Sequence, residues 1–426
     1  MSAFDKIIGY ETIKNEFMQL CDMVHNRSIY EKLGAKQPQG ILLYGNPGLG
    51  KTLMANCFIE ESGLKSYTVR RNKCANDFVS EIANTFKAAK ENAPAIVFLD
   101  DLDKYANEDE RRRDTQEYVA VQTGIDDIQN CDVFIIATAN NIEKLPYSLT
   151  RSGRFDRKIE VCIPTAKDAE EIIKHYLQDK KVSPDVSLED IAMMINYSSC
   201  AELETILNEA AINAAFARRP SISMDDLTNA VLRMQYHSPD NFSKPSEKDL
   251  QKTALHEAGH LVVCEVLCPG SVGLASLRSR GRDFADGFIR ICRELIRRPH
   301  RILVALGGKA AVELYHCETC ANCCQSDIER AVREIRNGIS QSGTCGLGLI
   351  HVATHQMPRV SENMNTKTEA VVHAELERYM FKARDILLKN MTFLKKAAAL
   401  LLEKETLLYS DIRALRESVT IVRVPV

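Results

Sequence analysis

The sequence predicts an α/β domain with a parallel sheet, then a small helical domain, then a second and mainly helical domain. Over residues 1–164, short apolar runs alternate with amphipathic helical stretches, which is typical of a doubly wound α/β domain. Residues 165–237 show helical patterns without strand-like runs. Residues 238–246 are polar and rich in proline and serine, so we expect a linker there. Helical patterns dominate again over residues 247–426.

Composition excludes several classes of protein. The 426 residues predict about two or three domains, at roughly 150 residues each. Lys and Arg number 55 against 58 Asp and Glu, and this balance gives no reason to expect a nucleic acid partner. No stretch approaches the roughly 18 apolar residues of a membrane span, and charged residues interrupt the start of the chain. We therefore expect a soluble, cytoplasmic chain whose 14 cysteines are mostly reduced.

Three apolar, β-branched runs are the expected central strands of the first domain: residues 40–44, 95–99 and 132–137. Uninterrupted apolar runs of this length suit strands that are covered on both faces. Between them, residues 79–91 carry apolar side chains at a helical period. The pattern predicts helices packed on the sheet.

A glycine-rich turn follows the first expected strand. Its sequence, Gly45-Asn-Pro-Gly-Leu-Gly-Lys51-Thr52, fits G-x-x-x-x-G-K-[ST], in which backbone N–H groups surround a phosphate at a helix start. Lys51 would reach the β- and γ-phosphates of ATP, and Thr52 would hold Mg²⁺. A chance turn is the alternative, which the preceding strand and the following helix disfavour. The expected nucleotide-binding residues here are Gly45, Asn46, Pro47, Gly48, Leu49, Gly50, Lys51, Thr52 and Leu53.

Further polar residues follow the other expected strands. Asp100, after the second, stands where a P-loop ATPase places the aspartate that orders water around Mg²⁺. Asn140, after the third, can orient the water that attacks the γ-phosphate. Arg151 and Arg154 lie too far along the chain to belong obviously to the same pocket. They suit arginine fingers that reach the ATP of a neighbouring subunit, which implies a ring.

With these motifs in order, the chain from Phe4 to about Met234 resembles the AAA+ ATPase module, and most of all that of the FtsH family of ATP-dependent zinc proteases. The resemblance is carried by Ile8-Gly9, Leu33-Gly-Ala-Lys36, the glycine-rich turn, Asp100-Asp101, Asn140, Arg151 and Arg154. It implies that Ile8 and Gly9 lie near the adenine. It also implies that residues 165–237 form the helical lid of the module.

Three departures from the family pattern affect the expected activity. Asp101 stands where the family has the glutamate that polarises the attacking water, and its carboxylate is about one methylene short. We expect slowed but real ATP hydrolysis. The pore loop falls on Lys73-Cys-Ala-Asn76, without the family's aromatic residue, so translocation should be weaker or restricted to particular substrates. Cys200-Ala201 replaces the Gly-Ala of the lid, and either His175 or Tyr176 would contact the adenine.

A second motif lies on a helix that we expect to begin near Ser246 and to end before Pro269. His256-Glu-Ala-Gly-His260 places two imidazoles on one helix face, where both can bind one Zn²⁺. Glu257 can reach a metal-bound water as general base. A catalytic zinc also needs a third protein ligand, which this motif does not contain.

From about Lys248 to Arg416 the chain resembles the FtsH peptidase domain. The matching segments are Ala254–His260, Leu306–Ala311, Ser326–Ala331 and Leu401–Leu407. The resemblance implies that Asp327 is the third zinc ligand and that residues 271–291 supply an edge strand for the substrate. Glu313 is an alternative third ligand.

A cysteine cluster directly precedes Asp327: Cys317, Cys320, Cys323 and Cys324. It could hold a structural metal, inhibit the active site or respond to oxidation, but four free thiols in a loop are the simplest interpretation. The apolar residues 419–426 are expected to form a β-strand, which packs on the peptidase domain or pairs with a neighbouring chain.

The combined prediction is an α/β P-loop AAA+ module, with a parallel sheet and a helical lid, followed by a mainly α zinc peptidase domain. The resemblance implies an ATP-dependent zinc endopeptidase that uses Zn²⁺, ATP and Mg²⁺, acts on unfolded or tagged proteins and forms a homohexamer. A remodelling ATPase or nucleotide switch with an idle or uncoupled peptidase is the alternative. FtsH proteins usually carry N-terminal transmembrane helices, so this chain is expected to be either a soluble member or a shortened one.

Overall fold

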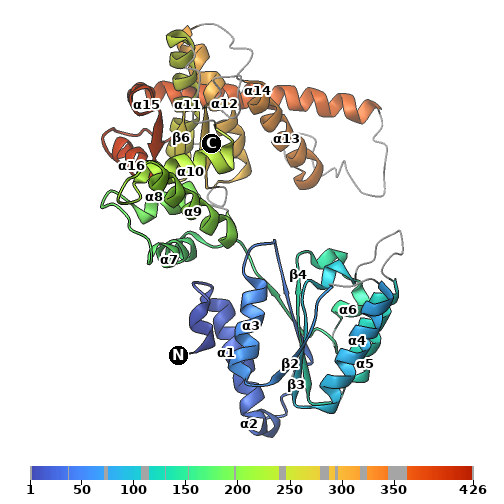
Figure 1. Ribbon diagram of the computed structural model, residues 1–426. Coiled ribbons are helices and arrows are strands. Elements are labelled where there is room, and N and C mark those ends of the chain that lie inside the picture. The colour runs from blue at the N-terminus through green and yellow to red at the C-terminus, as the bar shows by residue number, and fades with distance from the viewer. Residues whose placement is uncertain are drawn as a thin grey trace. The chain divides into compact units, whose positions relative to one another are not determined.

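The computed structural model describes residues 2–36, 38–71, 75–106, 115–129, 131–151, 153–195, 198–238, 246–278, 287–292, 296–316, 324–343 and 362–424. Contacts divide the chain into two compact units, Met1–Lys180 with Tyr197–Asn208, and Lys181–Asn196 with Glu209–Val426. The first is built on a sheet and the second mainly on helices (Figure 1). Helices of the segment 165–237 occur in both units, and the domain borders expected from the sequence stay a prediction.

The first unit contains a five-stranded parallel sheet in the order β2-β3-β4-β1-β5. Its strands are β1 Gly40–Tyr44, β2 Lys65–Val69, β3 Ala95–Leu99, β4 Val133–Ala139 and β5 Arg157–Glu160. The three predicted strands correspond to β1, β3 and β4, which lie in the middle and are almost entirely buried. The sequence does not predict β2 and β5 because these edge strands are polar and largely exposed.

Helices cover both faces of this sheet (Figure 1). The helices of the unit are η1 Ala3–Lys6, α1 Glu11–His25, α2 Arg27–Lys32, α3 Lys51–Ser62, α4 Ala75–Glu91, η2 Leu102–Lys104, α5 Thr115–Asp127, η3 Ile142–Lys144, α6 Tyr147–Thr150, α7 Ala166–Leu177 and the beginning of α9 Cys200–Phe216. Ile41 and Leu43 of β1 face the layer of α1 and α3, whereas Leu42 faces that of α4 and α5. The predicted α/β architecture is therefore confirmed.

The second unit is mainly helical, as predicted, around one apolar core. Its helices are α8 Leu188–Met194, α10 Met224–Tyr236, α11 Glu247–Leu267, α12 Arg298–His316, α13 Gln325–Ser342, α14 Glu362–Lys389, α15 Met391–Lys404 and α16 Tyr409–Glu417. Two glycines let α11 and α12 approach closely, because a side chain on Gly259 would overlap the backbone of Gly307. Helix α12 thus packs directly on the helix that carries the His-Glu-x-x-His motif.

A small antiparallel sheet completes the second unit, in the order β7-β6-β8. Its strands are β6 Val272–Ser276, β7 Phe288–Ile291 and β8 Thr406–Leu408. Glu265, near the end of α11, is fully buried and joins this sheet to α16. Its carboxylate accepts hydrogen bonds from the N–H groups of Gly270 (2.8 Å) and Val272 (3.0 Å), and it pairs with Arg416 (2.6 Å).

Residues 419–424, the described part of the C-terminal segment, do not form the β-strand that the apolar sequence predicts. The segment lies against the core of the second unit, where Asn390 bonds both backbone groups of Val422, at 2.8 and 3.0 Å. The side-chain amide of Asn390 therefore pairs both backbone groups of Val422, as a neighbouring strand would have done. Within the described ranges, no helix combines the length and apolarity needed to cross a membrane.

Candidate functional site

The glycine-rich turn leaves β1 at its carboxyl end and leads into α3, which begins at Lys51. Gly45, Gly48 and Gly50 have positive φ angles of 144°, 79° and 85°, which other residues rarely adopt. A side chain on Gly45 would also overlap the carbonyl group of Val161. This is the backbone that a phosphate site at a helix N-terminus requires.

Lys51 is buried within this turn. Its ammonium group donates hydrogen bonds to the carbonyls of Gly45 (2.8 Å) and Asn46 (2.7 Å) and to Asn140 Oδ1 (2.9 Å). Burial lowers the pKa of Lys51, although nearby aspartates act in the opposite direction. The structure thus brings Lys51 and Asn140, which are far apart in the sequence, into direct contact.

Asp100 directly follows β3 and is buried next to the phosphate turn. Its Oδ1 accepts hydrogen bonds from the hydroxyls of Thr52 (3.0 Å) and Thr138 (2.8 Å). The guanidinium of Arg70, just after β2, lies 3.3 Å from Oδ2. A hydroxyl and a carboxylate side by side offer the oxygen ligands that Mg²⁺ prefers. The sequence motifs predict Thr52 and Asp100 here, but no motif contains Arg70.

Asp101 has a left-handed backbone (φ 54°) at the start of η2. Its N–H donates to Thr138 Oγ1 (2.8 Å), and Asn140 Nδ2 lies 3.5 Å from its carboxylate. Lys104 forms an ion pair with Asp101 at 2.6 Å, and this hydrogen bond raises the pKa of Lys104. No sequence motif contains Lys104, although its position three residues after Asp101 on a helical turn could have indicated this contact.

A cavity of about 350 Å³ adjoins the phosphate turn within the first unit. Ile8, which the family resemblance places near the adenine, and Leu53, which follows the glycine-rich turn, both line this cavity. Both His175 and Tyr176 line it as well, so the structure does not choose between these two expected contacts. Cys200 also faces the cavity, and burial raises the pKa of its thiol.

Gly9 shapes this region without lining the cavity. It has a φ of 69°, and a Cβ there would lie 2.8 Å from Asp168 Oδ1. The same oxygen accepts a hydrogen bond from the N–H of Tyr10 at 3.0 Å. Glycine is therefore required where the chain turns toward the cavity.

The two arginines of the expected finger loop differ in environment. Arg151 is exposed, whereas Arg154 is buried. The Arg154 guanidinium is bound to Asp126 and Ser148 of its own chain. Among the described residues, neither arginine has a hydrogen bond or ion pair with the phosphate turn.

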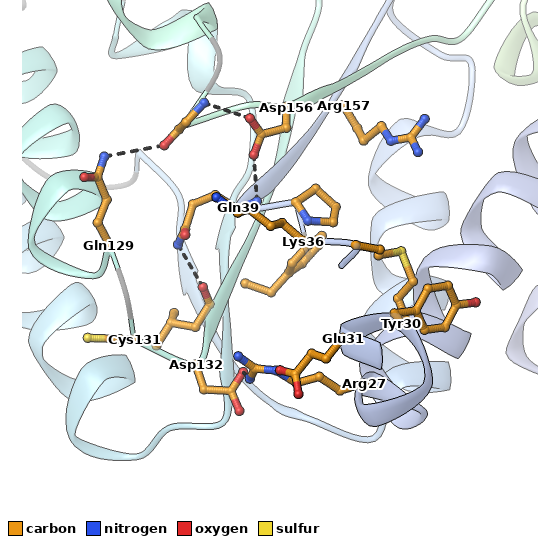
Figure 2. A pocket seen from close by; sticks show the side chains of 16 residues that line it. Arg27, Tyr30, Glu31, Lys36, Gln39, Gln129, Cys131, Asp132, Asp156 and Arg157 are labelled. Atoms are coloured by element: carbon orange, nitrogen blue, oxygen red, sulfur yellow. Dashed lines mark hydrogen bonds and ion pairs between the residues drawn. The ribbon is translucent and has the colours of Figure 1, made fainter. Parts of the chain in front are cut away.

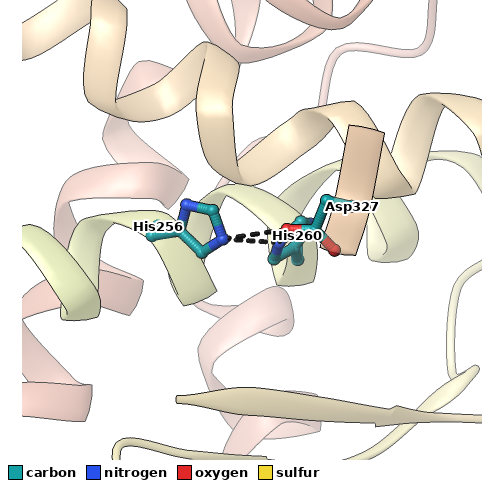
Figure 3. Close-up of side chains that lie close together, drawn as sticks. All are labelled: His256, His260 and Asp327. Atoms are coloured by element: carbon teal, nitrogen blue, oxygen red, sulfur yellow. Dashed lines mark hydrogen bonds and ion pairs between the residues drawn. The ribbon is translucent and has the colours of Figure 1, made fainter. Parts of the chain in front are cut away.

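The second unit brings together His256, His260 and Asp327, from α11 and from the first turn of α13 (Figure 3). Asp327 Oδ2 lies 3.1 Å from His256 Nε2 and 3.0 Å from His260 Nε2, and the two Nε2 atoms are 3.0 Å apart. All three side chains are buried. Two imidazole nitrogens and one carboxylate oxygen form the donor set of a catalytic zinc site, with a fourth position left for water.

Surrounding groups orient these ligands. His260 Nδ1 lies 2.6 Å from the Val304 carbonyl. Because a carbonyl oxygen can only accept a hydrogen bond, Nδ1 carries the proton and Nε2 is free to bind a metal. Burial disfavours the charged form of His260, but Asp327 outweighs burial and raises the pKa of this histidine. Burial acts against Asp327 as well, yet the two histidines hold the pKa of that carboxyl well below its usual range. A Cβ on Gly308 would lie 2.5 Å from His256 Cε1 and His260 Nε2, so glycine is needed beside the ligands.

Glu257, the expected general base, is buried on the same helix as the two histidines. Gly287, just before β7, packs on it, since a Cβ there would lie 2.5 Å from Glu257 Cγ. No sequence motif predicts this role for Gly287. The alternative ligand Glu313 is not in the cluster, because its carboxylate pairs with Lys309 (2.7 Å) and Arg384.

Two expectations fall outside the part of the chain that the structure describes. The pore loop is one, since Lys73 and Cys74 are not described and neither are the side chains of residues 75 and 76. The cysteine cluster is the other: Cys317, Cys320 and Cys323 lie outside, and only Cys324 is described, buried before α13.

Comparison with known proteins matches both units to family models. Residues 41–163 match the ATPase family associated with various cellular activities (AAA), and residues 243–415 match peptidase family M41. The chain is 31% identical over 449 residues to the ATP-dependent zinc metalloprotease FtsH 3 of Symbiobacterium thermophilum, covering 97% of this chain and 71% of that one. It is 31% identical to FtsH of Streptobacillus moniliformis, covering 97% of this chain and 64% of that one. For FtsH of Caldicellulosiruptor bescii the identity is 30%, over 97% and 72%.

Proposed function

Because the chain belongs to the FtsH family of ATP-dependent zinc metalloproteases, we propose that it hydrolyses peptide bonds in its second unit with the help of ATP hydrolysis in its first. Its cofactors are Zn²⁺, ATP and Mg²⁺. The observation that carries the proposal is the buried cluster of His256, His260 and Asp327, with Glu257 on the same helix.

The peptidase residues have separate roles in this proposal. His256, His260 and Asp327 would hold Zn²⁺, which would supply Lewis-acid chemistry by polarising the peptide carbonyl and lowering the pKa of bound water. The Val304 carbonyl keeps the proton of His260 on Nδ1 and so keeps Nε2 available. Glu257 accepts a proton from the attacking water on its carboxylate and passes it to the leaving amine. The edge strand β7 offers backbone groups to an extended substrate.

The nucleotide residues act in the first unit. Lys51 exchanges its present bonds to two backbone carbonyls for the β- and γ-phosphates. Thr52 and Asp100 would hold Mg²⁺, and Asp101 and Asn140 would position the attacking water. This assignment is supported by the contacts that already join these side chains.

The family membership supports a proposal for the assembly and the substrates of this chain. We propose a homohexamer in which a finger arginine reaches the ATP of a neighbour, and in which unfolded or tagged proteins are the substrates. Within each subunit, residues 1–164 and 165–237 form the ATPase module, 238–246 the linker and 247–426 the peptidase. Light scattering in ATP and Mg²⁺ tests the assembly, and a chain that stays monomeric would contradict the ring.

Degradation of casein tests the coupled activity. The purified chain, with Zn²⁺, ATP and Mg²⁺, is compared with Glu257→Gln and with a sample without ATP. We expect cleavage that requires both Glu257 and ATP, because the base acts at the zinc and hydrolysis delivers the substrate.

Other results would redirect the proposal. Cleavage without ATP would indicate a peptidase that works independently of the first unit. No cleavage, with zinc and nucleotide shown to bind, would favour a remodelling ATPase or switch, the alternative that the paired Asp101 motivates.

A further inference from the structure

Strand β7 has one face turned to α11, the helix that carries the general base. Gly287, directly before the strand, lies against this base, because a Cβ there would lie 2.5 Å from Glu257 Cγ. Ile289 and Ile291 pack against the apolar core that includes α11. Since side chains two apart in a strand lie on the same face, residues 287, 289 and 291 form the face toward α11. The position of β7 therefore decides how much room the side chain of Glu257 has.

Phe288 belongs to the opposite face of β7 and contacts Tyr236, the last residue of α10. The two rings are stacked, with their centroids 4.0 Å apart and their planes inclined by 23°. Both side chains are buried, Tyr236 being 3% and Phe288 8% exposed. Stacked aromatic rings bury a large apolar area in a defined orientation, so β7 cannot shift without disturbing this contact.

Further contacts attach the helices around α10 to the small sheet of the second unit. The carboxylate of Asp190 on α8 is buried and accepts hydrogen bonds from the N–H and the hydroxyl of Ser410 on α16, both at 2.8 Å. Gly273 of β6 packs directly on α8, since a Cβ there would overlap the carbonyl of Met193. Helices α8 and α10 thus belong to the same compact unit as β6 and α16 (Figure 1). They form a support on which β7 is held from one side.

We propose that Tyr236 is a positioning residue for the peptidase reaction. Its ring holds Phe288, and through β7 it keeps Gly287 against Glu257, so that the base stays in its working position beside the zinc ligands. The inference rests on the peptidase activity in the proposed function. It adds a residue that no sequence motif contains and that lies in the segment 165–237, which the family resemblance assigns to the lid of the ATPase module.

Cleavage of a short fluorogenic peptide by the full chain, in Zn²⁺, ATP and Mg²⁺, tests this role, because such a peptide needs no unfolding. Tyr236→Leu removes the stack but keeps an apolar side chain. We expect its kcat to fall at least about tenfold at an unchanged KM and zinc content, since a displacement of about 1 Å can cost about 100-fold. Tyr236→Phe keeps the ring and should stay near the parent. Phe288→Leu should match Tyr236→Leu, and the double variant should be no worse than either.

Tyr30→Leu is the matched control in the first unit. Tyr30 lines a cavity of about 900 Å³ near the amino ends of β1, β4 and β5 (Figure 2), and its hydroxyl donates a hydrogen bond to Asp22 at 2.6 Å. This variant also replaces an aromatic ring by leucine, but it changes nothing in the unit that contains β7. Its kcat for the peptide should therefore equal that of the parent.

A parent value of kcat in Tyr236→Leu would overturn the inference even if the Tm falls, because the stack would then serve stability alone. A raised KM with an unchanged kcat would also overturn it, since β7 would then act on the substrate instead of the base. The Tm values of the single and double variants test the stack without turnover, and additive losses of Tm would contradict it. A parent chain that binds zinc and cleaves no peptide would instead contradict the proposed function.

Discussion

The side chain of Asp101 is one methylene shorter than the glutamate that the family has at this position. Its carboxylate lies 2.6 Å from the ammonium group of Lys104 and 3.5 Å from Asn140 Nδ2. Asp101→Glu restores the missing methylene and should raise ATP turnover by up to about 100-fold, because a displacement of about 1 Å can cost that much. Phosphate release at saturating ATP and Mg²⁺ measures the effect. Lys104→Ala is the companion variant, and since Lys104 is 60% exposed its loss should change stability by less than about 1 kcal/mol. Unchanged turnover in Asp101→Glu would show that the reach of the carboxylate does not limit the reaction.

Gly287 keeps space for the general base of the peptidase. In Gly287→Ala the new Cβ would displace Glu257, so we expect casein cleavage to fall about 100-fold while bound zinc and ATPase rate stay at the parent values. Metal analysis and phosphate release provide the two controls, and Glu257→Gln shows the result of losing the base alone. Loss of zinc from Gly287→Ala would mean that the substitution disturbs the ligands rather than the base.

Residues that act within one short motif could be predicted from the sequence, and those that act across the fold could not. His256 and His260 follow from their spacing on one helix, and Lys51 follows from its glycine-rich turn. Asp327 needed the family resemblance, because its place beside the histidines depends on how α13 packs. Gly287 and Asp126 have no motif, since each matters only through a partner that folding brings to it.

At the scale of elements, burial decides what the sequence reveals. β1, β3 and β4 are covered on both faces and therefore read as apolar runs, while the edge strands β2 and β5 carry polar residues. In the C-terminal segment the opposite happens, because an apolar run predicts a strand that residues 419–424 do not form. Its apolar residues pack on the core of the second unit, where Asn390 takes the place of a strand partner.

An ion-pair network joins helices α12 and α14 through Glu313, Lys309 and Arg384. Burial would raise the pKa of Glu313, but the bonds from Lys309 and Arg384 outweigh it and lower that pKa below its usual value of 4.5. The network therefore stabilises the fold fully above pH 4.5 and ceases to do so as the pH falls through the lowered pKa.

Glu313→Gln should accordingly destabilise the chain by about 1 kcal/mol at neutral pH, with the difference disappearing in acid. Urea unfolding of the variant and the parent between pH 3 and pH 7 measures this difference. Glu369 pairs with Arg336 on the surface, so Glu369→Gln is a control in which we expect only a small change in stability. A difference that persists below the lowered pKa would show that Glu313 acts by packing rather than by charge.

At the scale of the whole molecule, the nucleotide residues and the zinc ligands belong to different compact units. Calorimetry should therefore resolve two transitions. Removing zinc with a chelator should lower only the transition of the second unit, and ATP with Mg²⁺ should raise only that of the first. A ligand at 100 times its Kd contributes about 2.7 kcal/mol to the unit that binds it. A single transition that responds to both treatments would mean that the two units unfold together.

The buried carboxylate of Glu265 has a consequence for synthesis on the ribosome. This residue is translated shortly after the zinc-binding histidines, but its partner Arg416 is translated about 150 residues later, near the end of the second unit. A buried carboxylate without its cation is strongly unfavourable. The helix that carries the metal motif therefore reaches its final packing only after Arg416 has been translated, so we expect the peptidase unit to mature after most of its own residues have been made.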